Sequence, residues 1–166
     1  MIPLKILTLI VTSKGQPSIL VLKPQEEAEN GIARILPIWI GTTEAAQLGV
    51  AMEHVKLPRP MTHDLFLDAL TNLDAHVDHV VITDVKGQTF YAQLYLRQGD
   101  RLITLDARPT DAISLALRQD APFYIEEQLL DEASYPYIFK SPVNDETELQ
   151  KFRTFLNGLS PDDFDV

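Results

Sequence analysis

Short stretches in which hydrophobic and polar residues alternate, separated by turn residues, run through much of the chain. Residues 89–97 show the clearest alternation, which is typical of an antiparallel strand with one buried face. Lys86-Gly87 before this stretch and Gly99-Asp100 after it favour tight hairpin turns. Pro37 indicates that the strand around it lies at a sheet edge or contains a bulge. The pattern predicts strands over residues 2–11, 18–22, 34–40, 77–84, 89–97, 101–106 and 122–125.

Helical spacing of hydrophobic residues predicts four helices, each opened by residues that favour a helix N-terminus. The first opens at Gly41-Thr42-Thr43-Glu44, where we expect a threonine to cap the helix, and the second at Thr62-His63-Asp64. The third opens at Arg108-Pro109-Thr110-Asp111. The fourth follows Asn144-Asp145-Glu146 and carries an apolar stripe.

Strands and helices do not alternate regularly along the chain, so the expected fold class is α+β. The architecture we expect is a mainly antiparallel sheet with three helices packed on it, plus a C-terminal amphipathic helix. A length of 166 residues suits one compact domain, which we predict over residues 1–133. A linker over residues 134–143, the last helix and an acidic tail are predicted to follow, through residue 166.

Composition narrows the function classes. The absence of cysteine excludes disulfides, thiolate metal sites and a cysteine nucleophile. The longest nearly apolar stretch, residues 6–11, is far shorter than the ~20 residues of a membrane span, and residues 1–11 lack the pattern of a secretory signal. We therefore expect a soluble, cytoplasmic protein without membrane contact.

The charge of the chain disfavours tight binding to nucleic acid. The net charge is −10, and residues 126–166 contribute 10 acidic against 3 basic side chains. Duplex nucleic acid is held mainly by lysine and arginine, and the sequence contains no run of these residues. A nuclease that binds its substrate weakly, with phosphate recruited through a cation or a helix end, is still compatible with this composition.

Two segments bring together residue types that could carry chemistry. In the first, His63 could act as an acid or base near neutral pH, and Asp64 could orient it or bind a metal. In the second, Asp106 and Asp111 could hold a divalent cation while Arg108 clamps a phosphoryl oxygen. Both segments also have a structural interpretation, because capped helix starts and Asp–Arg pairs use the same residue types.

Four separated segments, in this order, resemble the bifunctional nuclease domain family. They are Ile35-Leu-Pro-Ile-Trp-Ile-Gly-Thr-Thr-Glu-Ala, Pro58-Arg-Pro-Met-Thr-His-Asp-Leu, Val81-Ile-Thr-Asp with Thr89-Phe-Tyr-Ala, and Leu105-Asp-Ala-Arg-Pro-Thr-Asp-Ala-Ile-Ser-Leu-Ala-Leu-Arg. The resemblance covers about residues 1–133 and implies an α+β fold and homo-oligomers. It also implies DNase and RNase activity, which is attributed to some plant members. The positions that match the family's motifs are Glu44, Arg59, Thr62, His63, Asp64, Asp106, Arg108, Pro109 and Asp111.

Two hypotheses follow. The first is a nuclease that hydrolyses RNA and DNA with little sequence preference, in which Asp106 and Asp111 bind Mg²⁺ or Mn²⁺ and His63, with Asp64, activates water. Arg59 or Arg108 then stabilises the developing charge. The second hypothesis is a non-catalytic homo-oligomer that binds a small anion or a protein partner, in which the same motifs lock elements together.

Overall fold

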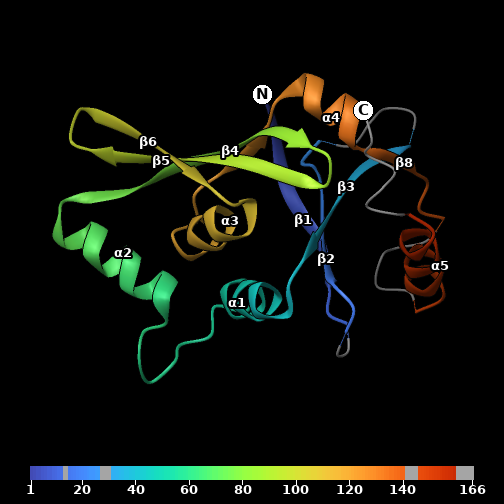
Figure 1. The fold of residues 1–166 in the computed structure, drawn as a ribbon, viewed down its shortest axis with the longest axis horizontal. Coiled ribbons are helices and arrows are strands. Elements are labelled where there is room, and N and C mark those ends of the chain that lie inside the picture. Colours follow the sequence, from blue (N-terminus) through green and yellow to red (C-terminus); the bar gives the residue numbers. More distant parts are fainter. Residues whose placement is uncertain (13–14, 27–30, 141–145, 160–166) are drawn as a thin grey trace.

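The computed structural model describes residues 1–12, 15–26, 31–140 and 146–159, and its centre is one eight-stranded sheet (Figure 1). The strand order is β6-β5-β4-β7-β1-β2-β3-β8. The strands are β1 (Ile2–Ile10), β2 (Ser18–Pro24), β3 (Ala33–Ile40), β4 (Ala75–Lys86), β5 (Thr89–Gln98), β6 (Arg101–Ala107), β7 (Phe123–Ile125) and β8 (Tyr135–Tyr137). The class is therefore α+β with a mostly antiparallel sheet, as the sequence predicts.

Two antiparallel groups of strands form the sheet, and the short strand β7 joins them. β7 pairs in parallel with β4 and antiparallel with β1, and the β4–β7 ladder is the one parallel pairing among the described strands. Pro37 lies in β3, an interior strand of the sheet order. Its partner is Val21 of β2, and the pairing of β3 with β8 covers only residues 33–35. β3 is therefore not the edge strand that Pro37 suggested, but the β3–β8 ladder does not reach Pro37.

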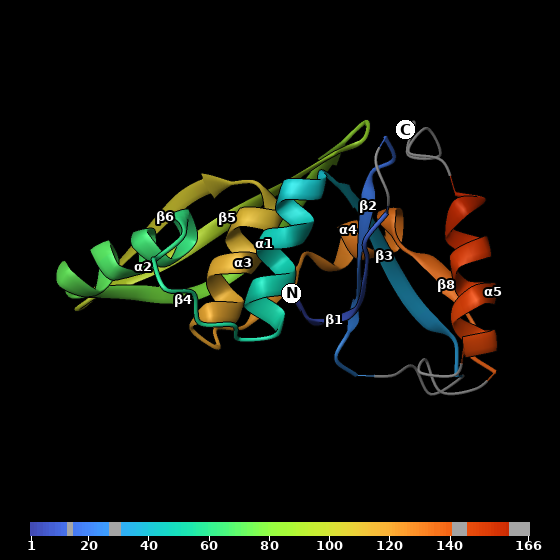
Figure 2. The same cartoon turned by 90° about the horizontal axis from the view of Figure 1, so that it is seen from below.

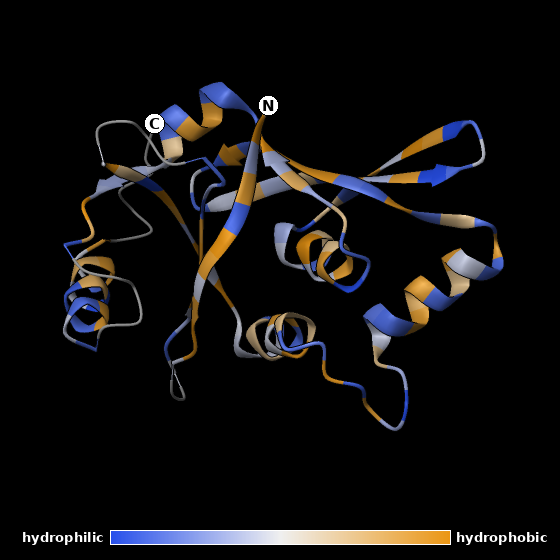
Figure 3. Cartoon of the chain, turned by 180° about the vertical axis from the view of Figure 1, so that it is seen from behind, coloured by the Kyte–Doolittle hydropathy of each residue, from blue (hydrophilic) through white to orange (hydrophobic). Residues whose placement is uncertain are grey.

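Three helices lie on the same side of the sheet: α1 (Thr42–Met52), α2 (Thr62–Asn72) and α3 (Pro109–Arg118) (Figures 1 and 2). α2 and α3 pack on the β4–β6 half, whereas α1 packs against α3 and β2. α3 is the most deeply enclosed of them, with Ala112, Ile113 and Ala116 fully buried. α2 is amphipathic, and Figure 3 shows hydrophobic and hydrophilic residues alternating along it. The buried residues of these helices share one core with the inner faces of the strands, so the beginnings of α2 and α3 are held firmly.

The C-terminal part differs from the sequence prediction. α4 (Glu127–Ala133) was not predicted, and β8 lies inside the segment that was predicted as a linker. The seven residues of α4 make only about two turns, too few to show a clear helical period, and Pro136 in the middle of β8 argues against a strand. α5 (Glu146–Asn157) packs Phe152 and Leu156 on β2 and β3, in a second core cluster. The predicted cap at Asn144-Asp145 and the predicted tail after Pro161 lie outside the described residues.

The first helix also begins differently from the prediction. Gly41 is the N-cap of α1 and no side chain caps this helix, so the expected threonine cap is wrong. Instead, the Glu44 carboxylate folds back over Gly41, and a Cβ atom at position 41 would overlap Glu44 Oε2. None of the helices in the described ranges combines the length and apolar character needed to cross a bilayer.

Candidate active site

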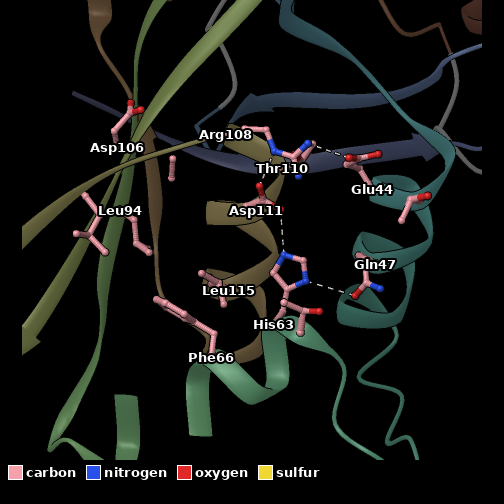
Figure 4. Close-up of a pocket in the computed structure, with 14 residues that line it drawn as sticks. Glu44, Gln47, His63, Phe66, Leu94, Asp106, Arg108, Thr110, Asp111 and Leu115 are labelled. Carbon is pink, nitrogen blue, oxygen red and sulfur yellow. Dashed lines mark hydrogen bonds and ion pairs between the residues drawn. The ribbon is translucent and has the colours of Figure 1, made fainter. Parts of the chain in front are cut away.

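A cavity of about 700 Å³ opens between α1, α2, α3 and the β5–β6 hairpin (Figure 4). The beginnings of the three helices supply its polar side chains, and the strands with α2 and α3 supply an apolar floor. The volume lies within the range of ~300–1,000 Å³ that is usual for small-molecule sites. The lining residues are Thr43, Glu44, Gln47, Thr62, His63, Phe66, Leu94, Leu105, Asp106, Ala107, Arg108, Thr110, Asp111 and Leu115.

His63 occupies the centre of the polar side. The backbone N–H of Met61 donates to Asp64 Oδ2 at 2.9 Å, which fixes the first turn of α2 and so the direction of the neighbouring His63. His63 Nε2 lies 3.2 Å from Asp111 Oδ1, and Nδ1 lies 3.4 Å from Gln47 Oε1. Only 14% of the His63 side chain is exposed. An ionised carboxylate only accepts hydrogen bonds, so Nε2 carries a hydrogen and Nδ1 is the nitrogen that can take up a proton.

Arg108 ties the third helix to the first. It is the N-cap of α3, and Pro109 at the first helical position has the backbone angle that a helix start requires. Arg108 Nε donates to Asp111 Oδ2 at 2.6 Å, and Nη1 donates to Glu44 Oε1 at 2.9 Å. The side chain is nevertheless 64% exposed, so the guanidinium faces the opening of the cavity. Glu44, Arg108, Asp111, His63 and Gln47 thus form one continuous array across three helices (Figure 4).

The array keeps Asp111 ionised. Partial burial of this carboxyl opposes ionisation, but the hydrogen bond and charge of Arg108, together with His63, outweigh burial and lower its pKa. The same contacts with Asp111, helped by Glu44, raise the pKa of Arg108. An ionised carboxylate beside Nε2 fixes the tautomer of His63.

Asp64, predicted beside His63 in a catalytic role, lies in a different network. Its Oδ1 accepts a hydrogen bond from Arg118 Nε at 2.8 Å, and it lines a separate hollow between α1, α2 and the end of α3. Burial opposes ionisation of Asp64, but the Met61 N–H and Arg118 lower its pKa overall. Arg118 is only 9% exposed and also donates to the backbone oxygens of Ser114 and Gln47. This network fits the structural interpretation of the Thr62-His63-Asp64 segment, in which Asp64 holds the start of α2 in place.

The structure does not bring Asp106 and Asp111 together. Asp106 borders the cavity, but it pairs with Gln93 across the β5–β6 ladder. The side chains of Asp106 and Gln93 therefore share the outer face of the sheet, whereas Leu105 turns toward the cavity. Figure 4 shows Asp106 apart from the array. Both oxygens of Asp111 are already bonded, to His63 and Arg108. Within the described ranges no group of three or more His, Asp or Glu side chains is placed to hold a metal ion.

Arg59, which was predicted to belong to the site, lies outside it, and Gln47, which was not predicted, belongs to it. Arg59 lies in the exposed turn between α1 and α2 and is not one of the cavity-lining residues. Gln47, which contacts His63, was missed by the sequence analysis. It stands three residues after Glu44 on α1, a spacing that places two side chains on the same helix face and that could have suggested it.

The comparisons with known proteins identify the family of the chain. The family model of the bifunctional nuclease domain matches residues 20–137, which include every residue of the array. The chain belongs to the bifunctional nuclease domain family. The match ends at Tyr137, the last residue of β8, so α5 lies outside the matched region.

Individual relatives fall into two groups. An uncharacterized protein of Mycobacterium tuberculosis is 41% identical over 136 residues, which cover 79% of this chain and 81% of the relative. The "Bifunctional nuclease 2" of Arabidopsis thaliana is 30% identical over 104 residues, 61% of this chain and 32% of the relative. "Bifunctional nuclease 1" of Oryza sativa subsp. japonica is 28% identical over 104 residues, with 61% and 31% covered. The matched segment therefore spans about a third of each of these plant proteins.

Proposed function

We propose that this cavity is the active site of a nuclease that cleaves RNA and DNA with little sequence preference. The observation that carries the proposal is the ion-paired array of His63, Asp111 and Arg108, which lines a cavity large enough for a nucleotide. A proton acceptor held by a carboxylate, beside an exposed guanidinium, suits phosphodiester cleavage, because the first can activate the attacking oxygen and the second can stabilise the developing charge. The names of the plant relatives support the same reaction class.

Each member of the array has a distinct role in the proposed reaction. Asp111 accepts the Nε2–H of His63 and leaves Nδ1 to take a proton from the attacking oxygen, which belongs to water or, in RNA, to the 2′-hydroxyl. As this oxygen bonds to phosphorus, the P–O bond to the leaving oxygen breaks, and the leaving oxygen takes a proton from the protonated His63 or from water. Gln47 can match both protonation states, because its amide oxygen accepts from a protonated ring and its NH₂ group donates to a neutral one. Arg108 uses two of its five N–H donors within the array, and the others can bind the phosphoryl oxygens as charge develops on them.

Mg²⁺ or Mn²⁺ assistance stays a prediction, and no step of this mechanism depends on it. The cytoplasmic location and the homo-oligomeric state also stay predictions.

The test of the proposed nuclease is cleavage of labelled single-stranded RNA and DNA, with EDTA, Mg²⁺ or Mn²⁺, by the wild type, His63→Ala and Asp111→Ala. We expect both variants, purified identically and shown to be folded, to lose ~10²–10⁴-fold in activity. Equal activity in all three proteins would reveal a contaminating nuclease and refute the proposal.

A second candidate is the non-catalytic module that binds a small anion or a protein partner. It is favoured by the mutual pairing of Glu44, Arg108, Asp111 and His63, which by itself joins α1, α2 and α3. Under this hypothesis, His63→Ala lowers the melting temperature and changes no cleavage rate. The same set of variants therefore distinguishes the two functions.

A further inference from the structure

The candidate active-site cavity has two chemically different halves. Its polar half is the array described above, and its other half is an apolar floor made by Phe66, Leu94, Leu105, Ala107 and Leu115. Phe66 follows His63 by three residues on α2, so both side chains project from the same side of the helix. In Figure 4 the Phe66 ring lies next to Leu115, below the imidazole of His63.

The apolar floor is open, unlike the core beneath it. The β5–β6 register pairs Leu105 with Leu94, so Leu105 faces the helices, yet 39% of it is exposed. Phe66 is also only partly buried, although it packs against the core. Leu94 and Leu115 behind them are almost completely buried. The exposed apolar surface is thus confined to the part of the floor that the cavity opens onto.

We propose that this floor binds one unstacked nucleobase of the substrate, with Phe66 as the stacking surface, while Arg108 and His63 bind the adjoining phosphate. This inference rests on the proposed function and specifies its substrate as single-stranded nucleic acid. A base inside a duplex is stacked on both faces and must leave the stack to reach such a floor. Stacking on an aromatic ring tolerates every base, which agrees with cleavage of little sequence preference.

Because the protein is acidic, part of its affinity for nucleic acid has to come from contacts that are not electrostatic. Arg108 is the one Lys or Arg side chain among the cavity-lining residues, and Glu44 and Asp111 already pair with it. Affinity that came mainly from phosphate contacts would require several such cations and would fall steeply with salt. Binding through a stacked base and a single guanidinium instead predicts weak affinity with a shallow dependence on salt.

The test compares two probes that differ only in the base: adenosine 5′-monophosphate and ribose 5-phosphate. Their dissociation constants are measured by titration calorimetry or NMR on the full chain. We expect adenosine monophosphate to bind the wild type at least about tenfold more tightly, and Phe66→Ala to abolish that preference without changing the affinity for ribose 5-phosphate. Leu65→Ala is the matched control, because Leu65 is an exposed neighbour on α2 outside the cavity lining.

Equal affinity of the wild type for the two probes would overturn the inference without the need for any variant. So would a Phe66→Ala protein that keeps the preference. If Phe66→Ala does not fold, Leu105→Asp replaces it, because Leu105 is already partly exposed. The two proposals fail separately. A base preference without cleavage refutes only the nuclease activity, and His63-dependent cleavage without a base preference refutes only the nucleobase site.

Discussion

His63 Nε2 and Asp111 Oδ1 lie 3.2 Å apart, although 48 positions separate the two residues in the sequence. The contact exists because α2 and α3 begin at the same end of the helical layer, with α1 beside them (Figure 2). Both motifs that the sequence marks as candidate chemistry therefore meet in one cavity. The meeting point depends on the sheet, since α3 is fixed by the strands that precede and follow it.

Asp111 and Asp64 are expected to have opposite effects on activity and stability. Asp64→Ala removes the acceptor of the Met61 N–H and the partner of Arg118, so it should lower the free energy of unfolding by about 1–2 kcal/mol. Cleavage per folded molecule should hardly change. Asp111→Asn should cost less than about 1 kcal/mol, because the pair is partly exposed, but should lower the cleavage rate by more than about tenfold. Chemical denaturation measures the free energy of unfolding, and initial rates on the same preparations measure cleavage. A larger loss of cleavage in Asp64→Ala than in Asp111→Asn would contradict the proposed site.

The pH dependence of stability follows from the same carboxyl group. The pKa of Asp111 is lowered in the folded state, so its stabilising contribution is fully present above the unfolded pKa of about 3.9 and is lost as pH falls through the folded value. The difference in free energy of unfolding between the wild type and Asp111→Asn should therefore be constant from pH 7 to 5 and shrink below about pH 4. A urea denaturation series over this range tests the sign. A difference that grows toward acidic pH would mean that Asp111 is not ion-paired.

Gly41 controls the position of Arg108 through Glu44. A Cβ at position 41 would overlap Glu44 Oε2, and this carboxylate anchors Arg108 Nη1. We expect Gly41→Ala to raise KM several-fold with little change in melting temperature, because the displaced Glu44 carboxylate is the far end of a flexible, partly exposed side chain. Gly49→Ala is the matched control on the same helix: an added Cβ there meets no atom within 4 Å and should stabilise α1 by ~0.5–1 kcal/mol. An unchanged KM in Gly41→Ala would show that Glu44 does not position Arg108.

A second His–Asp pair serves as an internal control. His79 Nδ1 lies 2.7 Å from Asp78 Oδ2, and Arg97 Nε donates to Asp78 Oδ1. His79 stacks on Tyr95, its cross-strand partner, on the outer face of the sheet, away from the cavity. His79→Ala should therefore lower the melting temperature and leave the cleavage rate unchanged. A loss of cleavage in His79→Ala equal to that in His63→Ala would mean that the cavity is not the site of cleavage.

Much of this arrangement could be predicted from the sequence, because hairpins and helix starts depend on local chemistry. The alternation of β5 predicts its buried face correctly, and Gly87 has the positive φ of 56° expected of a tight hairpin turn. The position of β7 between the two groups of strands could not be predicted, because three residues are too few to indicate which strands they pair with. Asp106 illustrates a different limit. Its motif suggests a partner for Asp111, but a one-residue step along a strand reverses the face, so Asp106 and Leu105 point in opposite directions.

The most direct test of the central claim is chemical rescue of His63→Ala by imidazole. We expect this variant, folded and free of contaminating nuclease, to lose cleavage of single-stranded RNA and to regain part of it in proportion to added imidazole. His79→Ala, assayed in parallel, should show neither the loss nor the rescue. Cleavage by His63→Ala at the wild-type rate, or a loss that imidazole does not restore at any pH between 5 and 8, would contradict the role of His63 as the proton acceptor.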